Sequence, residues 1–448
     1  MDIPKHIFRA YDIRGLLAEV TPEIAKAVGQ ALVVKTGAKI VIVGRDMRET
    51  SPELQLAAID GITSMGANVI DIGMCSTSMY NFAVSSQEHI DAGLMVTASH
   101  KPPEYNGIKM ALASGLPVSG VEILEELNKQ HQPEANVLKG SVTEQDVLST
   151  YIDKCISVAN PPDLSGIKIV VDYGNGMGAM GIREVCKRLH IEMIELFPEP
   201  DAHFPNHPAN PAIEETLDVL KATVLREKAM LGVALDGDAD RIAFIDNEGF
   251  SLRGDLALVV FAKEILLHVS GAKVVVAPNQ SWTTIDSIVE AGGELIESPI
   301  GRTFMIRKMA EFDAVISGEV SGHFFFPEFS NLESVDHAFV RMLSVWKNSG
   351  VTFADFVRPL RAYHNSGEIN FEVHNKAKIL AALKETYGSK ATRVNELDGI
   401  RCDFDRDWWF IVRASNNEPL IRLIIEAKTE ESLNEKRNEL VAFVEANK

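Results

Sequence analysis

The chain has 448 residues, of which 46% are hydrophobic and 24% charged, and it carries a formal net charge of −19. These values are typical of a globular protein and exclude intrinsic disorder, collagen-like repeats and a disulfide scaffold. The acidic balance argues against nucleic-acid binding, which needs a basic surface, and no apolar run approaches the ~18 to 20 residues that cross a membrane.

The cysteines indicate the compartment. Cys75, Cys155, Cys186 and Cys402 lie far apart and form no CxxC pair, so neither disulfides nor a zinc site is indicated. The opening segment lacks the apolar stretch of a signal peptide. We therefore expect a reduced, cytoplasmic protein, and a prior of roughly 150 residues per domain predicts three or four domains.

A weak internal repeat is the most informative feature in chain order. Three times a Gly-x-Lys step leads into a β-branched apolar run, which is typical of a buried strand in a parallel sheet. These runs are Gly37–Val43, Gly166–Asp172 and Gly271–Ala277. A helix is predicted after each run, and the first opens at Ser51-Pro52-Glu53 with Ser51 as its cap. Second strands are predicted at Asn68–Gly73, Ile191–Phe197 and Glu294–Glu297.

Each unit then supplies a third apolar segment that ends in a polar motif. These segments are Asp91–His100, Met230–Arg241 and Phe312–His323. Because ligands of open α/β sheets bind beyond the carboxyl ends of strands, three equivalent motifs predict three similar domains that face one cleft. Chance repetition of Val/Ile runs after glycine is the alternative.

The pattern changes from about residue 361. Strands are predicted at Glu368–Val373, Trp408–Arg413 and Leu420–Glu426, with a helix between the first two and a helical end from about Glu430. Two or three antiparallel strands with two helices indicate an α+β module. We predict α/β domains at residues 1–150, 151–250 and 251–360 and a smaller α+β domain at 361–448, with a hinge at Asp153–Asp163.

The segment Asp236-Gly-Asp-Ala-Asp-Arg241 carries the strongest signal for chemistry. Three aspartates at alternate positions after a strand repel one another unless a cation neutralises them, and hard oxygen ligands suit Mg²⁺. A calcium-binding EF-hand loop is excluded because its sixth and twelfth positions would be Arg241 and Asn247. A solvated acidic turn is the bland alternative.

Ser99 ends the third apolar segment of the first unit. Ser99 and His100 are adjacent, so in an extended chain their side chains point apart, and no G-x-S-x-G elbow is present. A hydrolase triad is therefore not expected. Lys101 and Lys109 better suit a serine that carries phosphate, where cations hold the transferred group, although most serines have no such role.

Two further polar motifs suit a phosphorylated sugar. Glu319 and Ser321 alternate within Ser317–His323, so both could contact vicinal hydroxyls. The loop Arg413–Pro419, together with Arg422, offers two guanidinium groups, a hydroxyl and two amides, which are usual receptors for a phosphate dianion. An ordinary turn and an unspecialised surface loop are the alternatives.

A competing interpretation rests on Gly176-Met-Gly-Ala-Met-Gly181, which follows a predicted strand, with Glu195 at the next one. This spacing matches a dinucleotide fingerprint and would indicate an NAD-dependent oxidoreductase. That interpretation leaves the aspartates, the serine loop and the arginine loop without a purpose, and a close helix–strand packing turn explains the glycines equally well.

Taken together, the four motifs and the opening Phe8-Arg-Ala-Tyr-Asp-Ile-Arg-Gly15 resemble the α-D-phosphohexomutase family over essentially the whole chain. The resemblance implies three tandem similar α/β domains with mixed sheets and a smaller C-terminal α+β domain around a central cleft. It implies an isomerase that interconverts hexose 1-phosphate and hexose 6-phosphate through a phosphoserine and a hexose 1,6-bisphosphate.

The resemblance also implies roles for individual residues. Ser99 would carry the phosphoryl group, and Asp236, Asp238 and Asp240 with a phosphoserine oxygen would hold Mg²⁺. Arg14, Lys109 and Arg241 would line the transfer site near Tyr11, and Glu319 and Ser321 would contact the sugar. The other phosphate would be bound by Arg413, Ser415, Asn416, Asn417 and Arg422, with Arg302 as a further substrate contact. Lys109 and His323 are both candidates for the general base or acid.

Sugar preference is the weakest part of the implied activity. The motifs look most like phosphomannomutase or dual phosphomannomutase/phosphoglucomutase members, and Tyr105 stands where phosphoglucosamine mutases usually have Asp. Departures from the family pattern are Lys101, Asn417, Arg302 after Gly301, and the segment Asn331–His337. We expect mannose phosphate and also glucose phosphate as substrates of a monomer or homodimer, with a phosphoglucosamine mutase or a non-catalytic phosphosugar-binding protein as alternatives.

Overall fold

The computed structural model describes residues 3–129, 138–415 and 419–448. They form two compact units: the first comprises Met1–Phe261 with Val315–Phe356, and the second comprises Ala262–Ala314 with Val357–Lys448. Among the described residues no helix is long and apolar enough to cross a membrane.

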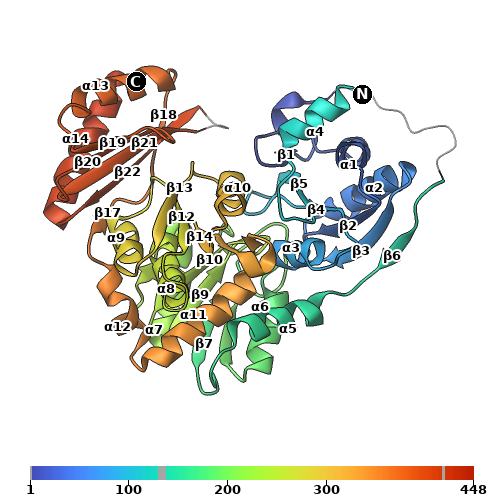
Figure 1. Ribbon diagram of the computed structural model, residues 1–448, viewed down its shortest axis with the longest axis horizontal. Coiled ribbons are helices and arrows are strands. Elements are labelled where there is room, and N and C mark those ends of the chain that lie inside the picture. The colour runs from blue at the N-terminus through green and yellow to red at the C-terminus, as the bar shows by residue number, and fades with distance from the viewer. Residues whose placement is uncertain (1–2, 130–137, 416–418) are drawn as a thin grey trace. The chain divides into compact units, whose positions relative to one another are not determined.

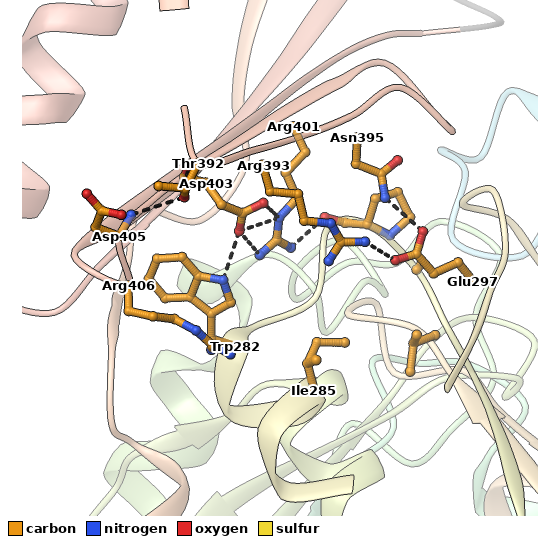
Figure 2. Close-up of a pocket in the computed structure, with 13 residues that line it drawn as sticks. Trp282, Ile285, Glu297, Thr392, Arg393, Asn395, Arg401, Asp403, Asp405 and Arg406 are labelled. Atoms are coloured by element: carbon orange, nitrogen blue, oxygen red, sulfur yellow. Dashed lines mark hydrogen bonds and ion pairs between the residues drawn. The ribbon is translucent and has the colours of Figure 1, made fainter. Parts of the chain in front are cut away.

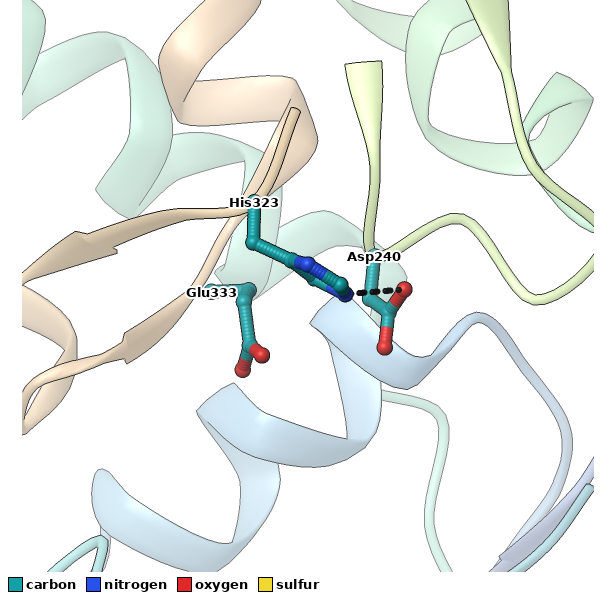
Figure 3. A group of neighbouring side chains, drawn as sticks. All are labelled: Asp240, His323 and Glu333. Atoms are coloured by element: carbon teal, nitrogen blue, oxygen red, sulfur yellow. Dashed lines mark ion pairs between the residues drawn. The ribbon is translucent and has the colours of Figure 1, made fainter. Parts of the chain in front are cut away.

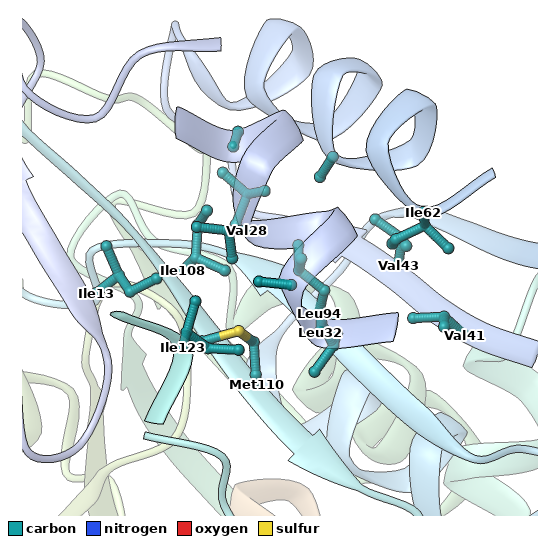
Figure 4. Close-up of a cluster of buried hydrophobic side chains, with 14 of the residues drawn as sticks. Ile13, Val28, Leu32, Val41, Val43, Ile62, Leu94, Ile108, Met110 and Ile123 are labelled. Carbon is teal, nitrogen blue, oxygen red and sulfur yellow. The ribbon is translucent and has the colours of Figure 1, made fainter. Parts of the chain in front are cut away.

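The first unit opens with a mixed six-stranded sheet in the order β1-β5-β4-β2-β3-β6, beside which helices α1 and α2 lie (Figure 1). Its strands are β1 (Ile13–Leu16), β2 (Ile40–Arg45), β3 (Asn68–Met74), β4 (Ala92–Val96), β5 (Tyr105–Leu112) and β6 (Val142–Glu144). Its helices are α1 (Pro22–Thr36), α2 (Ser51–Ser64), α3 (Thr77–Ser85), α4 (Gly120–Leu127) and α5 (Leu148–Ala159). Apolar side chains of the strands and of α1 and α2 form one core (Figure 4).

A second sheet of the first unit has the order β11-β10-β9-β7-β8. Its strands are β7 (Lys168–Asp172), β8 (Glu192–Leu196), β9 (Leu231–Leu235), β10 (Ile242–Asp246) and β11 (Ser251–Leu252), with helices α6 (Ala179–Arg188) and α7 (Asp218–Glu227). The strand β7 is parallel to β8 and β9, whereas β10 is antiparallel to β9. The sheet is therefore mixed, as in the first domain.

The remaining part of the first unit has short antiparallel strands and a long helix. They are β14 (Ile316–Gly318), β15 (Phe324–Phe326), β16 (Leu332–Glu333) and α11 (Val335–Ser349). Helix α8 (Gly254–Leu266) and helix α12 (Phe353–Val357) lie at the points where the chain passes between the units.

The second unit contains the parallel pair β12 (Lys273–Val276) and β13 (Glu294–Glu297), with α9 (Trp282–Glu290) and α10 (Arg302–Phe312). Its C-terminal sheet has the order β17-β22-β21-β20-β19, with β18 also paired to β22. These strands are β17 (His364–Asn365), β18 (Ile369–Glu372), β19 (Arg393–Asn395), β20 (Ile400–Phe404), β21 (Trp408–Ala414) and β22 (Leu420–Ala427). Helices α13 (Lys376–Tyr387) and α14 (Glu430–Asn447) pack on this antiparallel sheet.

The predicted repeat is present in the backbone. The glycines that open its three runs, Gly37, Gly166 and Gly271, all have positive φ, between 67° and 78°, and strands β2, β7 and β12 begin within three residues of them. A side chain would strain this left-handed turn. The polar motifs follow β4, β9 and β14, and each connects to an antiparallel strand.

Three details of the prediction are wrong. Thr50, not Ser51, precedes α2 as its cap, because the Ser51 hydroxyl donates instead to Asp46 Oδ1 at 2.6 Å. Most of the expected hinge, Asp153–Asp163, is helical, since α5 continues to Ala159. The C-terminal sheet has six strands in the described residues rather than two or three. The buried charges Arg401 and Asp403 on β20 hid that strand from a hydrophobic pattern.

A buried polar cluster fixes α5 to α11. The Tyr151 hydroxyl lies 2.7 Å from Ser334 Oγ and donates to Asp336 Oδ2 at 2.9 Å. Burial raises the pKa of Asp336 to about 7. Oδ1 of Asp336 has no hydrogen-bond partner within the described part of the chain, which also disfavours the charged carboxylate.

The cluster predicts a pH dependence of stability. The carboxyl of Asp336 titrates near 3.8 when unfolded and near 7 when folded, so from about pH 4 to pH 7 the folded state binds more protons and the free energy of unfolding falls as pH rises. We expect Asp336→Asn to remove about 2–4 kcal/mol of that fall. Urea unfolding at pH 5 and pH 8 measures it, with the exposed Asp153→Asn as control; a variant with the wild-type pH slope would refute the assignment.

Candidate active site

The serine loop runs from the end of β4 to the start of β5. Ser99 has a φ of 54° and its side chain is buried. Its hydroxyl donates to Asp236 Oδ2 at 2.8 Å and lies 3.1 Å from Nδ1 of His100. The expectation that Ser99 and His100 point apart is therefore wrong, because the backbone at Ser99 is left-handed rather than extended. Non-glycine residues in this region are strained and occur often at functional sites.

The predicted metal loop connects β9 to the antiparallel strand β10. Ligand oxygens of Asp236, Asp238 and Asp240 lie within 4.8 Å of one another, and all three side chains are buried. Amides of Asp240 and Arg241 donate to Asp236 Oδ1 at 3.0 and 3.2 Å. Oδ1 of Asp238 has no hydrogen-bond partner among the residues described.

Lys109 lies against this loop. Its Nζ donates to Asp238 Oδ2 and to Asp240 Oδ2, at 2.6 Å each. The pairing of β4 with β5 sets its position, because Lys109 lies opposite Met95, near the carboxyl end of β4. The ammonium group of Lys109 thus links strand β5 of the first sheet to two carboxylates in the loop between β9 and β10 of the second sheet.

The crowded charges shift the ionisation of the carboxylates. Burial, and then the charges of Asp240 and Asp238, raise the pKa of Asp236 to about 7. Burial would also raise the pKa of Asp240, but Lys109 and His323 hold it well below its usual range. The loop needs added positive charge if all three carboxylates are to ionise together.

His323 ends the segment Ser317–His323 and brings it against the aspartate loop, Asp236–Arg241. Its Nε2 lies 3.2 Å from Asp240 Oδ1, and its Nδ1 lies 2.9 Å from Glu319 Oε2 and 3.0 Å from Ser321 Oγ. Glu319 and Ser321 therefore contact the same imidazole nitrogen, consistent with their alternation. Burial alone would lower the pKa of His323, yet Asp240 raises it to about 9.

Two of the remaining predicted residues of the first unit, Arg241 and Arg14, lie near this centre. Arg241 Nε lies 3.3 Å from His323 Nε2 and 3.7 Å from Asp236 Oδ2. Arg14, on β1 opposite Gly107 of β5, pairs with Asp12. The pKa of His100 is lowered by burial, then by the charge of Arg241, and then by the charge of Arg14. Tyr11 is partly buried in the turn before β1.

Several neighbours of the centre were not predicted from the sequence. Thr77 and Thr97 donate to Asp238 Oδ2 at 2.6 and 3.2 Å. Glu333 has a carboxylate oxygen within 4.8 Å of ligand atoms of Asp240 and His323 (Figure 3), and Asn81 donates to it at 3.2 Å. Thr97 stands two residues before Ser99 in the sequence, and this proximity could have identified it as part of the site.

The arginine loop belongs to the second unit. Arg413 and Arg422 are cross-strand partners on β21 and β22, and Ser415 N donates to Leu420 O at 2.9 Å. Asp398 lies 3.7 Å from Arg413 and accepts the amide of Ile300, two residues before Arg302 at the start of α10. These predicted residues therefore gather within one unit. Asn416 and Asn417 lie outside the described residues.

A cavity of about 410 Å³ in the second unit is lined by residues of β12, α9, β19 and β20 (Figure 2). Its three arginines are each paired with a carboxylate: Arg393 with Glu297, Arg401 with Asp403, and Arg406 with Asp286. Neutralised guanidinium groups make a weak anion site, and the predicted site residues that the structure describes do not line this cavity.

The glycine-rich segment Gly176–Gly181 packs against the metal loop. A Cβ on Gly176 would lie 2.7 Å from the carbonyl oxygen of Gly237, and Met177 N donates to that oxygen at 3.0 Å. The packing turn thus accounts for the first glycine of the fingerprint, and the oxidoreductase interpretation loses its main support.

Four family models match successive segments of the chain, in order, between residues 5 and 443. The models described as Phosphoglucomutase/phosphomannomutase, alpha/beta/alpha domains I, II and III match residues 5–134, 149–249 and 253–363. The model of the C-terminal domain matches residues 368–443. Four matches in tandem define a four-domain α/β protein. The chain belongs to the phosphoglucomutase/phosphomannomutase family of phosphohexomutases.

Individual relatives agree. The chain is 33% identical over 442 residues to phosphohexose mutases of Xanthomonas campestris pv. campestris, which covers 97% of this chain and 98% of the relative. It is 33% identical over 454 residues to an Escherichia coli phosphomannomutase, covering 98% of each. The crystal structure of a family protein from Burkholderia thailandensis has a TM-score of 0.90 at 28% identity, over 100% of this chain and 98% of that one.

Family membership confirms the predicted fold class: three α/β domains with mixed sheets precede a C-terminal domain with an antiparallel sheet. The predicted boundaries at residues 150, 250 and 360 stay predictions. So do the roles of the individual site residues.

Proposed function

We propose that the chain is a phosphohexomutase that interconverts hexose 1-phosphate and hexose 6-phosphate with Ser99 as the phosphoryl carrier, with mannose as the first substrate and glucose as the second. The observation that carries this proposal is the contact of Ser99 Oγ with Asp236 at 2.8 Å, in a loop whose other aspartates bind Lys109. A hydroxyl, a carboxylate cluster and a fixed ammonium are the components of a phosphoryl-transfer site.

The residues present fit Mg²⁺. Three buried carboxylates supply hard oxygen ligands, and the unpartnered Asp238 Oδ1 is an available one. Asp236, Asp238, Asp240 and an oxygen of phosphoserine 99 would hold the ion. When bound, it supplies neutralisation of the charge on the phosphoryl oxygens.

The transfer follows from the protein's own groups. Phosphoserine 99 meets a free sugar hydroxyl; the Oγ–P bond breaks, a bond from phosphorus to the sugar oxygen forms, and the hydroxyl proton ends on Ser99 Oγ. Lys109 Nζ and His323 are both candidates to move that proton. Arg14 and Arg241 supply further positive charge for the transferred group. The hexose 1,6-bisphosphate then returns its other phosphate to Ser99.

The sugar and its second phosphate need separate contacts. Glu319 and Ser321 are proposed to bind sugar hydroxyls, because both lie beside His323, which in turn contacts Asp240 of the aspartate loop. Arg302, Arg413, Ser415 and Arg422, with Asn416 and Asn417, are proposed to bind the phosphate that is not transferred. We also infer a cytoplasmic location, where the four buried cysteines stay as free thiols. A monomer or homodimer stays a prediction.

Intact-mass measurement tests the proposal directly. We expect the purified protein to carry one phosphate-sized addition at Ser99, removed by excess hexose phosphate and restored by hexose 1,6-bisphosphate. Assays with mannose, glucose and glucosamine 1-phosphates, each primed with its bisphosphate, should give turnover in that order. NAD reduction without sugar-phosphate turnover would reject the proposal, and a preference for glucosamine would replace the sugar assignment.

A further inference from the structure

Arg48 is a buried charged residue that the mechanism above does not use. It lies in the segment between β2 and α2, and its side chain is only 2% exposed. Its guanidinium donates four hydrogen bonds to backbone carbonyls: those of Ser99 at 2.9 Å, Lys101 at 2.5 Å, Pro102 at 2.9 Å and Tyr105 at 2.9 Å. All four acceptors belong to the loop that carries Ser99.

The guanidinium is itself held in place. Its Nε lies 3.3 Å from Asp46 Oδ2. Asp46 is anchored by the Ser51 hydroxyl at 2.6 Å and by its own amide, which donates to Val96 O at the end of β4 at 2.9 Å. The ring of Phe204, from the second sheet's part of the unit, covers the guanidinium with its centroid 5.4 Å away. Arg48 is thus fixed to the strand that ends next to Ser99.

The bonds match what the serine loop requires. Ser99 is in the left-handed region, a conformation that persists only where the surroundings determine it strongly. The bond to the Ser99 carbonyl sets the plane of the peptide that follows Ser99, while Thr97 Oγ1 accepts the Ser99 amide at 2.9 Å. A planar guanidinium can satisfy four carbonyls together, whereas a lysine ammonium has only three donors.

We propose that Arg48 is a positioning residue for phosphoryl transfer: it fixes the loop from Ser99 to Tyr105 so that Ser99 Oγ faces the aspartate loop, without touching the sugar. This inference rests on the proposed function. A misplacement of about 1 Å in a reacting group can cost about 100-fold in rate. The role therefore belongs to kcat, since the contacts that bind the substrate are left in place.

Two variants test the inference. Arg48→Lys keeps the charge but not the four bonds. The double variant Asp46→Asn/Arg48→Met removes both buried charges together, so no carboxylate is left buried without its partner, and Asp46→Asn alone is its reference. We expect each Arg48 variant to lower kcat by about 100-fold, with KM for the hexose phosphate within about threefold of wild type.

The control is Arg401→Lys. Arg401 is also buried, pairs with Asp403 and donates to two backbone carbonyls, those of Pro278 and Gln280, all within the second unit. We expect the urea midpoint of Arg401→Lys to fall about as far as that of Arg48→Lys, while its kcat stays within about threefold of wild type. A second readout is rescue: millimolar methylguanidine should restore part of kcat in Arg48→Ala and should leave the kcat of Arg401→Lys unchanged.

The outcomes separate the two proposals. A wild-type protein without phosphate on Ser99 and without sugar-phosphate turnover would reject the proposed function. The Arg48 inference is rejected if folded Arg48 variants, single or double, keep kcat within about threefold. It is equally rejected if kcat falls by the same factor in Arg401→Lys, because Arg48 would then act through general stability alone.

Discussion

Ser99→Ala is expected to lose at least about 1,000-fold of the mutase kcat, because no other group replaces a covalent phosphoryl carrier. The substituted side chain is small and the left-handed backbone is held by Thr97 and Arg48, so the fold should persist. The dissociation constant for hexose 6-phosphate should stay within about threefold. Coupled-enzyme assays give the rate, and isothermal titration gives the binding.

A matched control is Ser344→Ala, a buried serine on α11 with no contact to the metal loop in the described structure. It should keep wild-type turnover. If Ser99→Ala turned over hexose phosphate at more than about one tenth of the wild-type rate, another residue would carry the phosphoryl group.

The sequence predicted the residues whose signal is local. Asp236 directly follows the buried strand β9, with Asp238 and Asp240 shortly after it, and Ser99 comes shortly after the buried strand β4 in the preceding domain. Ligands of open α/β sheets bind beyond the carboxyl ends of strands, so equivalent strand ends in two similar domains predicted a shared site. The arginine loop was found for a related reason, since it joins two strongly apolar strands, β21 and β22.

The contacts between these motifs could not be predicted from the sequence. Lys109 reaches Asp238 and Asp240 only through the register of β4 and β5. Arg48 binds backbone carbonyls, which leave no trace in the side-chain pattern. The contact of Ser99 with His100 depends on one φ angle, for which the letters Ser and His carry no preference.

The aspartate loop gives the second large effect, on metal binding. Oδ2 of Asp238 already accepts from Lys109, Thr77 and Thr97, whereas its buried Oδ1 has no hydrogen-bond partner in the described residues. An amide in place of this carboxylate keeps the size but removes the charge that a divalent ion requires. We expect Asp238→Asn to lower kcat by at least about 100-fold, corresponding to about 3 kcal/mol.

The stability response identifies the cause of that loss. At a Mg²⁺ concentration 100 times the dissociation constant, the wild-type protein should gain about 2.7 kcal/mol of unfolding free energy. Asp238→Asn should gain less than a third of this, while without metal it should be about as stable as wild type, because one of three mutually repelling carboxylates is gone. Thermal and urea unfolding with Mg²⁺ and with EDTA measure both quantities.

Asp246→Asn is the matched control for the metal response. Asp246 is buried at the end of β10, in the same sheet as the aspartate loop, and its Oδ1 accepts the amides of Glu248 and Phe250, which an asparagine oxygen can also accept. This variant should keep both the metal response and the rate. An Asp238→Asn protein that behaved like Asp246→Asn would show that the divalent ion binds elsewhere, because the loop's unpartnered oxygen would then have no part in holding it.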